Sequence, residues 1–205
     1  MLKLYDLHRS GNCYKVRLLL SFFRLEYEKV SVNANAGENR TPEFFKLNPR
    51  GQLPVLEDDG RALWDSTAIL VYLAAKYGEE HWLPREPYML ACVMQWLALE
   101  QNEGRYGLAR ARAIALGNPT PFAQLGNIDE CRALADTALN VLETRLKSNS
   151  WLVGTQITIA DVACYPYVAL APEGDIDVGP YPAVGRWQAR IEALPNYVPL
   201  PQISG

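Results

Sequence analysis

The stretch Asn48–Leu70 constrains the fold of this chain more than any other part of its sequence. An apolar run, Leu53–Leu56, is short enough for a buried strand, and the turn signal Asp58–Gly60 separates it from a second short run, Arg61–Trp64. An acidic residue and a serine come next, and they open the segment Thr67–Lys76, whose apolar residues recur at helical spacing. The stretch therefore predicts two strands around a turn that lead directly into a helix.

Two features of this stretch have chemical as well as structural meaning. Pro54 stands at the start of the predicted strand, and a cis bond there would turn the N–H and C=O of Leu53 outward, where a small peptide can pair as an extra strand. Asp65 and Ser66 stand at a helix N-terminus, where free amides and the positive end of the dipole suit an anion. Each feature alone is typical of an ordinary edge proline or helix cap. The combination, with a hairpin between them, is much more specific.

Composition excludes several classes of protein. The 205 residues suffice for one domain or two small ones, and 49% of them are hydrophobic, enough for a sizeable core. A net charge of −3 without a basic cluster argues against a nucleic-acid partner. We expect no secretory signal and no membrane span, because no apolar run is long enough. The four cysteines show no metal-ligand spacing and there are only two histidines, so we expect no metal site, and reduced thiols in the cytoplasm.

Strand and helix patterns alternate through the first part of the chain. Before the hairpin, the sequence predicts a strand at Leu2–Tyr5, a loop at Asp6–Cys13, a helix at Tyr14–Arg24, a strand at Tyr27–Val32 and a short helix that begins at Thr41–Phe45. A crossover between parallel strands, followed by an antiparallel hairpin, indicates a mixed sheet with helices packed on it. The predicted order is βαβαββα.

The second part of the chain is predicted to be all-α. Residues 78–87, which contain prolines and acidic side chains, are interpreted as a linker between a first domain at 1–77 and a second at 88–205. The segment Tyr88–Leu116 has one long helical pattern, with Gly104 and Gly107 as places where it can bend. Further along, the sequence predicts a loop at Gly117–Gly126, a helix at Ile128–Lys147, a loop at Pro172–Pro182 and a last helix at Ala183–Leu194.

A helix start with a clear signature lies in this second domain. Thr158 and Asp161 have the spacing of a capping box, in which each side chain bonds to the backbone of the other residue. Ile157 and Val162 flank the pair as a hydrophobic staple. We interpret this device as structural and not catalytic.

These features together resemble the glutathione transferases. The asparagine-proline pair, the aliphatic residue before Pro54 and the acidic-serine pair that opens a helix are similar to the glutathione-site signature of that family. The strand order is similar to its thioredoxin-like domain, and the device from Thr158 to Asp161 is similar to its folding box. The resemblance implies an α/β thioredoxin-like N-terminal domain, an all-α C-terminal domain, glutathione as co-substrate, no metal, and a cytoplasmic homodimer.

The loop before the first helix supplies polar groups suited to a thiol substrate. A thiol with a pKa of about 8.5 is mostly protonated at neutral pH, so an enzyme that uses its thiolate has to stabilise the negative charge. A hydroxyl and the amides at a helix N-terminus both do so. Ser10, Asn12 and the start of the helix at Tyr14 provide these groups in one place.

Three catalytic assignments follow from the resemblance. Ser10 matches the serine of theta- and delta-like enzymes, and also the threonine of the bacterial nu-like group, in which an asparagine at the position of Asn12 approaches the sulfur. Cys13 would suggest a cysteine enzyme of the beta-like class, but it is displaced by about three residues and we interpret it as a packing residue. Tyr5 lies near the tyrosine of other classes, from which the loop departs. We assign catalysis to Ser10, assisted by Asn12.

The remaining glutathione contacts are implied by the same resemblance. Leu53, held by the turn at Pro54, would pair its backbone with the cysteinyl part of glutathione. Ser66 would bind the γ-glutamyl carboxylate and Asp65 the γ-glutamyl ammonium. The glycine carboxylate needs a cation or an amide donor, for which Gln52 is the better candidate and Arg40 the alternative.

A second site, for the electrophile, is expected along the long helix. Tyr106 and Arg110 are the assigned wall residues, and Arg112 and Tyr165 are further candidates. Aromatic residues here can equally be core residues, and arginines at this spacing can form a solvated face.

Three functions remain open from the sequence. The first is a glutathione transferase that conjugates the thiol to a small hydrophobic electrophile. The second is a nu-like glutathione-dependent disulfide oxidoreductase or peroxidase, favoured by Ser10 and Asn12. The third is a noncatalytic scaffold that kept the fold, since a fold does not prove turnover.

Overall fold

The structure is a computed structural model that describes residues 1–118 and 120–201. It divides into two compact units. The first comprises Met1–Glu79 and the described residues from Pro195 onward, and the second comprises Glu80–Leu194. Within the described residues, no helix is long and apolar enough to cross a membrane, and no three potential metal ligands gather in one place.

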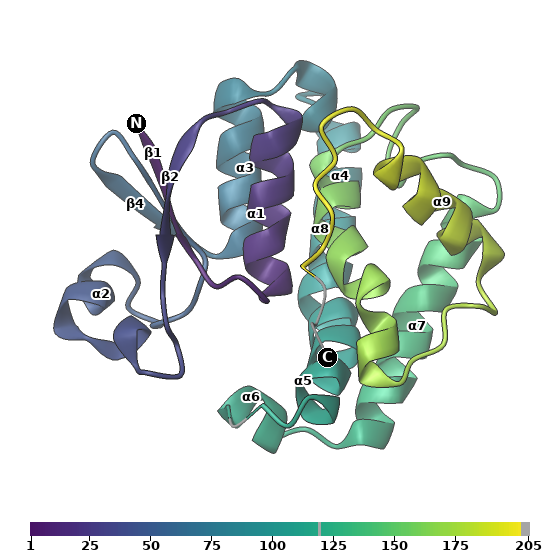
Figure 1. Cartoon of the computed structure of the whole chain (residues 1–205). Helices are drawn as coiled ribbons and strands as arrows, with labels where there is room; N and C mark the ends of the chain where they lie inside the picture. Colours follow the sequence, from purple (N-terminus) through teal and green to yellow (C-terminus); the bar gives the residue numbers. More distant parts are fainter. Residues whose placement is uncertain (119, 202–205) are drawn as a thin grey trace. The chain divides into compact units, whose positions relative to one another are not determined.

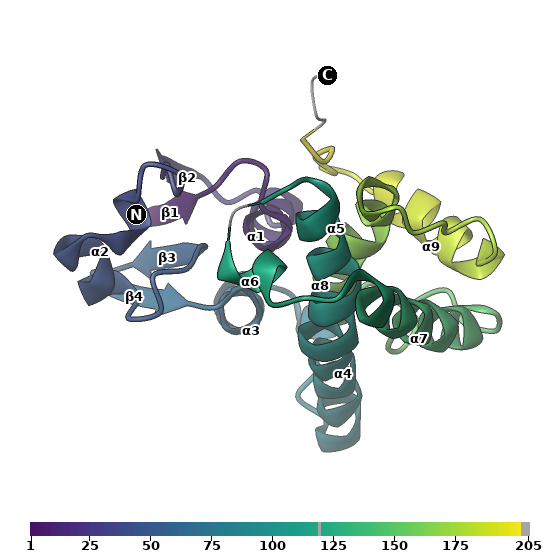
Figure 2. The same ribbon diagram turned by 90° about the horizontal axis from the view of Figure 1, so that it is seen from below.

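The first unit contains, among its described residues, a four-stranded mixed sheet. In chain order its elements are β1 (Leu2–Asp6), α1 (Gly11–Phe22), β2 (Tyr27–Ser31), η1 (Glu38–Arg40), α2 (Pro42–Leu47), β3 (Val55–Asp58), β4 (Arg61–Trp64) and α3 (Ser66–Tyr77). The strand order is β2-β1-β3-β4, with β1 parallel to β2 and antiparallel to β3. Figures 1 and 2 show α1 and α3 side by side on one face of the sheet and α2 on the other. The predicted thioredoxin-like fold is confirmed.

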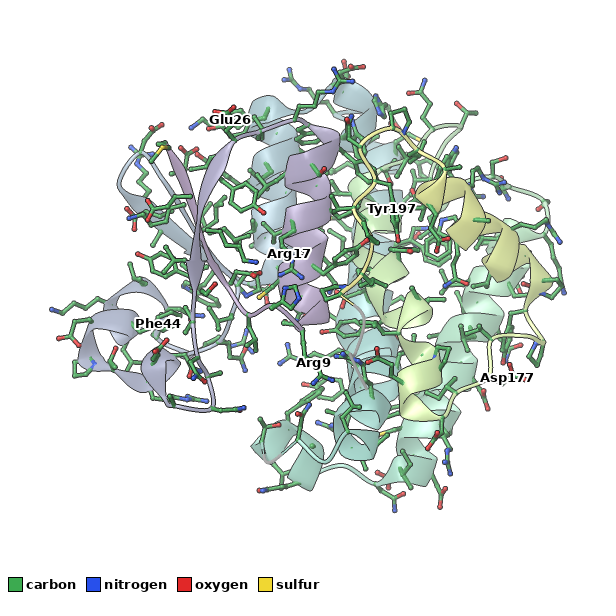
Figure 3. All side chains as sticks on the ribbon, in the orientation of Figure 1. Arg9, Arg17, Glu26, Phe44, Asp177 and Tyr197 are labelled. Atoms are coloured by element: carbon green, nitrogen blue, oxygen red, sulfur yellow. The ribbon has the colours of Figure 1, made fainter. Side chains whose placement is uncertain are left out.

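The face covered by α2 has a small apolar core. Phe44, labelled in Figure 3, extends from α2 and packs with Val32 and Val55, both buried. Its ring meets that of Tyr5 edge to face, with centroids 6.1 Å apart. Leu53 packs against the same cluster. The core therefore holds the chain in place where it enters β3.

Two element boundaries differ from the predictions, each for a local reason. α1 begins at Gly11, not at Tyr14, because the Ser10 hydroxyl accepts a hydrogen bond from the Cys13 amide at 3.3 Å and caps the helix. The strand predicted from Leu53 begins only at Val55, where pairing with β1 starts, because the proline between them has no N–H to donate.

The C-terminal segment packs on the first unit, although the predicted second domain includes it. The buried Tyr14 donates from its hydroxyl to the carbonyl of Val198 at 2.6 Å. Ser21, further along α1, donates to the carbonyl of Asn196 at 2.7 Å. Two side chains of α1 thus bind the segment through its backbone carbonyls. Every residue has such a carbonyl, so the packing could not be predicted from the sequence of the segment.

The second unit is helical throughout its described residues, as predicted. Its elements are η2 (Glu80–Trp82), α4 (Pro87–Leu99), η3 (Glu100–Ala109), α5 (Arg110–Ala115), α6 (Pro121–Gln124), α7 (Ile128–Leu146), α8 (Ile159–Ala169), η4 (Ala171–Gly174) and α9 (Pro182–Glu192). The short α6 and η4 lie in segments that the sequence predicted as loops. Both contain proline in or beside the first turn, which favours a short helical start.

The single long helix predicted at Tyr88–Leu116 is in fact three consecutive helical segments. Its middle part, η3, is a π-helix that contains Gly104 and Gly107. A Cβ atom on Gly107 would lie 2.5 Å from the backbone nitrogen of Ala135 on α7, so only glycine permits this approach. The sequence pattern did not reveal this segment, because the i→i+5 hydrogen bonds that define a π-helix join backbone groups, which the side-chain pattern does not show.

The capping box is present and is also a junction of the second unit. Asp161 is fully buried and accepts hydrogen bonds from the amides of Leu152 and Thr158, at 3.0 and 2.9 Å. It also accepts one from the indole N–H of Trp187 on α9 at 2.9 Å. This one carboxylate therefore links the start of α8 to the segment before it and to α9.

A second buried carboxylate links the β3–β4 hairpin to α3. Asp58 is 4% exposed, and its Oδ2 accepts hydrogen bonds from Lys76 at 2.6 Å, Tyr77 at 2.6 Å and Tyr72 at 2.8 Å. Burial alone would raise the pKa of Asp58, but these three donors outweigh it and hold the pKa at about 2. The carboxylate thus stabilises the folded state only while it is ionised.

We expect Asp58→Asn to remove a pH-dependent part of the stability. Because the folded pKa lies below the unfolded value of about 3.9, the carboxylate contributes about 2 kcal/mol above pH 4, and this contribution is lost as the pH falls from about 4 to 2. Urea unfolding at pH 7, 4 and 3 measures it. The variant should unfold more easily at pH 7 and lose less stability on acidification than the wild type.

The matched control is Asp59→Asn, because Asp59 pairs with the same lysine at 3.1 Å but its side chain is 72% exposed. An exposed pair contributes little, so this variant should behave like the wild type. An equal acid dependence in wild type and Asp58→Asn would contradict the assignment.

Candidate functional site

The loop between β1 and α1 is fixed at both of its ends. Asp6, buried at the end of β1, forms an ion pair with Arg17 of α1 and a second one with Lys29 at 3.4 Å. Arg17, labelled in Figure 3, also donates to the carbonyl of His8 at 2.8 Å. Ser10 then caps α1 with its half-buried hydroxyl. The predicted catalytic serine therefore stands at a helix N-terminus on a loop held by a buried ion pair.

Asn12 connects this helix start to that of α3. Its Oδ1 accepts hydrogen bonds from the ammonium of Lys15 at 2.8 Å and from the hydroxyl of Ser66 at 3.3 Å. Ser66 is 3% exposed and is the first residue of α3. Three predicted site residues, Ser10, Asn12 and Ser66, thus lie at two adjacent helix N-termini, where backbone amides and helix dipoles favour an anion.

Asp65 caps α3 in an unusual backbone conformation. Its φ of 74° and ψ of 126° are rare for a residue other than glycine. Its Oδ1 accepts hydrogen bonds from the amide of Thr67 at 3.0 Å and from the Thr67 hydroxyl. Its Oδ2 lies 3.6 Å from a guanidinium nitrogen of Arg50. Strain of this kind, about 1–3 kcal/mol, persists where surrounding contacts impose it and is common at functional sites.

Buried side chains hold the backbone that leads to β3. The Leu53–Pro54 bond is cis, as the sequence interpretation supposed. Two buried asparagines support the approach to it: Asn39 donates to the carbonyl of Gly51 and Asn48 to that of Gln52, both at 2.7 Å. Leu53 lies just before the β1–β3 ladder, so its backbone does not pair with β1.

Gln52 and Arg40, the residues predicted to bind the glycine carboxylate of glutathione, have different surroundings. Gln52 is exposed. Arg40 is also exposed and donates to the carbonyl of Arg50 at 3.4 Å, which places its guanidinium over the turn at Gly51. Arg50, which the sequence interpretation missed, stacks on Trp64 at 5.8 Å and pairs with Asp65. Its position directly after the asparagine-proline pair was the one available signal.

The two other candidates for sulfur chemistry are occupied by structural contacts. Burial raises the pKa of the Cys13 thiol to about 12, and its sulfur accepts a hydrogen bond from the amide of Leu7 at 3.3 Å. A thiol of this kind is not a nucleophile at neutral pH. The hydroxyl of Tyr5 donates to Glu57 at 3.4 Å, and burial, followed by the Glu57 charge, raises its pKa.

Within the second unit, the two predicted electrophile-site residues belong to one group of side chains. Arg110 lies over the rings of Tyr106 and Phe122, at 4.6 and 4.8 Å from their centroids. Arg105 lies over the same rings at 5.8 and 5.6 Å. We name these four residues the arginine–aromatic cluster. Tyr106 is 39% exposed, and the buried Nε of Arg110 has no hydrogen-bond partner among the described residues.

The further candidates for that site lie in the core of the second unit. Arg112 is buried and forms an ion pair with Glu173. Tyr165 is fully buried, packs its ring against Trp187 with centroids 6.1 Å apart, and donates to Glu192 at 2.8 Å. Their contacts are structural.

Comparison with known families gives matches over both units. Residues 1–75 match the family model of the glutathione S-transferase N-terminal domain, and residues 122–195 match that of the C-terminal domain. The disulfide-bond oxidoreductase YfcG of Escherichia coli is 31% identical over 193 residues, which cover 91% of this chain and 88% of that protein. Glutathione S-transferase D7 of Anopheles gambiae is 34% identical over 187 residues, 90% of this chain and 83% of that protein.

Solved structures are similar over the same length. A glutathione S-transferase from Pseudomonas fluorescens is 38% identical, with a TM-score of 0.88 and coverage of 97% of this chain and 98% of that one. A glutathione transferase homolog from Lodderomyces elongisporus, solved with two glutathione molecules per subunit, is 26% identical, with a TM-score of 0.84 and coverage of 95% and 94%. The helix starts at Ser10 and Ser66, the turn at Pro54 and these matches lead to one conclusion: the chain belongs to the glutathione S-transferase family.

Proposed function

We propose that this protein is a glutathione transferase, in which Ser10 stabilises the thiolate of glutathione for attack on a small hydrophobic electrophile. The observation that supports this most is the hydrogen bond between Asn12 and Ser66, at 3.3 Å, because it holds two helix N-termini together beside the Ser10 hydroxyl. A carboxylate and a thiolate are both anions, and each is stabilised at such a helix start.

Glutathione would lie along the backbone from the Pro54 turn to the start of α3. We assign the backbone of Leu53 to the cysteinyl part and the buried Ser66 to the γ-glutamyl carboxylate. Asp65 is assigned to the γ-glutamyl ammonium. Its carboxylate can accept several hydrogen bonds, so the ion pair with Arg50 at 3.6 Å does not prevent this contact. Gln52, with Arg40 as the alternative, is assigned to the glycine carboxylate.

In the proposed reaction the protein chiefly stabilises and orients one charge. The Ser10 hydroxyl donates a hydrogen bond to the sulfur, and the α1 amides add the positive end of the helix dipole, so the thiol loses its proton to water more readily. The thiolate attacks an electrophilic carbon; a C–S bond forms, the bond to the leaving group breaks, and that group departs with its electron pair. Asn12 assists by donating from its amide.

A second function uses the same bound thiolate on another atom. Attack on the glutathione sulfur of a mixed disulfide would break the S–S bond, form glutathione disulfide and release the other thiol. Attack on a peroxide would instead break the O–O bond, release an alcohol or water and leave a sulfenic acid on glutathione, which a second glutathione converts to the disulfide and water. Two observations favour this alternative. The polar side chain of Asn12 stands beside Ser10 at the helix start, and the relative named a disulfide-bond oxidoreductase is 31% identical. A noncatalytic scaffold remains the third alternative.

Two assays on wild type and two variants separate these functions. We expect retention on immobilised glutathione, and either conjugation of 1-chloro-2,4-dinitrobenzene or reduction of a small mixed disulfide. Ser10→Ala removes the hydroxyl next to the sulfur and should lower kcat/KM of the active assay by roughly 10- to 100-fold. Ser10→Thr keeps both the hydroxyl and the helix cap and should retain most of the activity.

Ser31→Ala, at an exposed position on β2, is the matched control and should behave as the wild type. Faster turnover of the disulfide than of the aromatic halide would replace the first function by the second. Glutathione binding without either reaction would favour the scaffold, and a wild type that does not bind glutathione would reject both catalytic functions.

We propose that the arginine–aromatic cluster forms a wall of the electrophile site and favours an electrophile with a negative charge. Its support is the chemistry of the cluster: two guanidinium groups lie over two rings, and neither is in an ion pair among the described residues. Flat rings suit an aromatic ligand, and an unpaired guanidinium suits a carboxylate or another anionic substituent.

Arg110→Met tests this charge preference, since methionine keeps the apolar contact and removes the charge. With 4-chloro-3-nitrobenzoate as electrophile, kcat/KM should fall about tenfold, the size expected for a lost charge-assisted hydrogen bond. With the uncharged amide of the same acid it should change little. Arg132→Met, on the exposed side of α7, is the control. An equal fall for both electrophiles, or for neither, would contradict the preference.

We also propose that the protein is a cytoplasmic homodimer, as the resemblance implies. Four cysteines without a disulfide suit a reducing compartment. Large apolar side chains are exposed on two neighbouring helices of the second unit: Met94 on α4 by 49% and Val141 on α7 by 41%. A shallow pocket between them is lined by Trp96 and Val141 among others. Exposed apolar surface of this kind is typical of an interface.

Light scattering checks the dimer. We expect a mass of twice 23.0 kDa for the wild type. Val141→Glu places a charge on the apolar surface and should shift the mass toward the monomer at low concentration, with an unchanged circular dichroism spectrum. Leu125→Glu, at a residue that is 83% exposed outside α4 and α7, should leave the mass as it was. A monomeric wild type would refute the proposal.

A further inference from the structure

A fully buried lysine lies directly behind the proposed sulfur site. Lys15 is 0% exposed on the first turns of α1, and its ammonium donates to Oδ1 of Asn12 at 2.8 Å. Burial of an ammonium costs several kcal/mol unless the surroundings compensate it. The positive end of the α1 dipole also opposes a cation here, so the hydrogen bond to Asn12 is one of the contacts that has to compensate this cost.

The lysine determines which way the amide of Asn12 faces. An ammonium only donates hydrogen bonds, so the atom that faces it has to be the amide oxygen and not the nitrogen. The hydroxyl of Ser66, on α3, donates a hydrogen bond to the same oxygen of Asn12 at 3.3 Å. With its oxygen held by two donors, the amide can turn over only by placing its N–H groups against an ammonium. Its orientation is therefore fixed by chemistry.

The nitrogen of the amide is consequently available on the opposite side. Among the described residues, Nδ2 of Asn12 forms no hydrogen bond, and the side chain is half-buried rather than enclosed. Two N–H groups thus face away from Lys15 at the same helix start that Ser10 caps. An ammonium on the oxygen side also polarises the amide and makes its N–H groups stronger donors.

We propose that Lys15 is a positioning residue that fixes and polarises the Asn12 amide, so that its N–H groups stabilise the thiolate of bound glutathione. The inference rests on the proposed function and adds a residue to it. Lys15 acts through Asn12 and does not touch the sulfur. The negative charge on the sulfur is then shared between the hydroxyl of Ser10 and an amide held in one orientation.

The thiol pKa of enzyme-bound glutathione tests this role directly, because a merely structural lysine would not change it. The thiolate absorbs in the ultraviolet, so a pH titration of the wild-type complex gives the value, and a parallel binding titration gives Kd. Lys15→Met fills the same space without a charge. We expect it to raise the pKa of the bound thiol by about 1, and to change the Kd of glutathione by less than about threefold when Kd is measured at a pH where the bound thiol is protonated.

Asn12→Asp is the second variant, and it does not depend on tolerance of a methionine in the core. It keeps an oxygen for Lys15 but replaces the N–H groups by a second oxygen, so the bound thiol pKa should rise by more than in Lys15→Met. Lys46→Met, at an exposed position on α2, is the control and should leave the value unchanged.

The outcomes separate this inference from the proposed function. A wild type that does not bind glutathione would overturn both. Binding with an unchanged thiol pKa in a folded Lys15→Met variant would overturn the positioning role alone. If Lys15→Met does not fold, the value in Asn12→Asp decides, since an unchanged pKa there refutes the role of the amide and a raised one supports it.

Discussion

The hydrogen bond between Asn12 and Ser66 is the contact at which the anchored elements of the first unit meet. It joins the N-termini of α1 and α3, each of which bears about half a positive charge. Two such ends repel each other in the absence of an anion, and the buried ammonium of Lys15 adds to the positive potential. The amide oxygen of Asn12 lies between these groups and accepts from both sides. Helix N-termini of this kind are places where backbone amides and the dipole favour an anion.

The groups around this junction are held by structure that has no part in the chemistry. Asp6 fixes Arg17, and Arg17 fixes the loop that leads to Ser10. On the other side, Asp58 ties the hairpin to the far end of α3 through Lys76 and two tyrosines. The strained backbone of Asp65 is held between these anchored elements, and the hydrogen bonds to Thr67 offset part of its cost. Precision at the helix starts thus comes from charges buried elsewhere in the unit.

The parts of this architecture that were predictable from the sequence are those with local signals. The pair Asp65 and Ser66 before an apolar helix, and the box from Thr158 to Asp161, both specify a helix start within a few residues. The order of strands and helices along the chain, and the mixed sheet, followed from alternation and turn residues. Each of these depends on neighbours in the chain.

Features that depend on distant residues were not predictable in the same way. The start of α1 was predicted three residues late, because glycine and asparagine at its first positions resemble a loop. Arg50 could not be recognised as a site residue from the sequence, because its ion pair with Asp65 forms only when the hairpin brings the two residues together. Likewise, a lysine is usually exposed, and Lys15 is buried because that side of α1 faces the interior of the unit. The π-helical segment depends on the close approach of Gly107 to α7, which no local pattern encodes.

The packing of residues 196 and 198 on α1 affects the order in which parts of the protein can fold during synthesis. The carbonyl groups of Asn196 and Val198 supply acceptors to Ser21 and Tyr14, which the ribosome releases far earlier. The hydroxyl of Tyr14 can form this particular hydrogen bond only after residue 198 has been synthesised. The first unit therefore completes this face of α1 only after residues 80–194 of the second unit, which lie between its two parts in the sequence, have been synthesised.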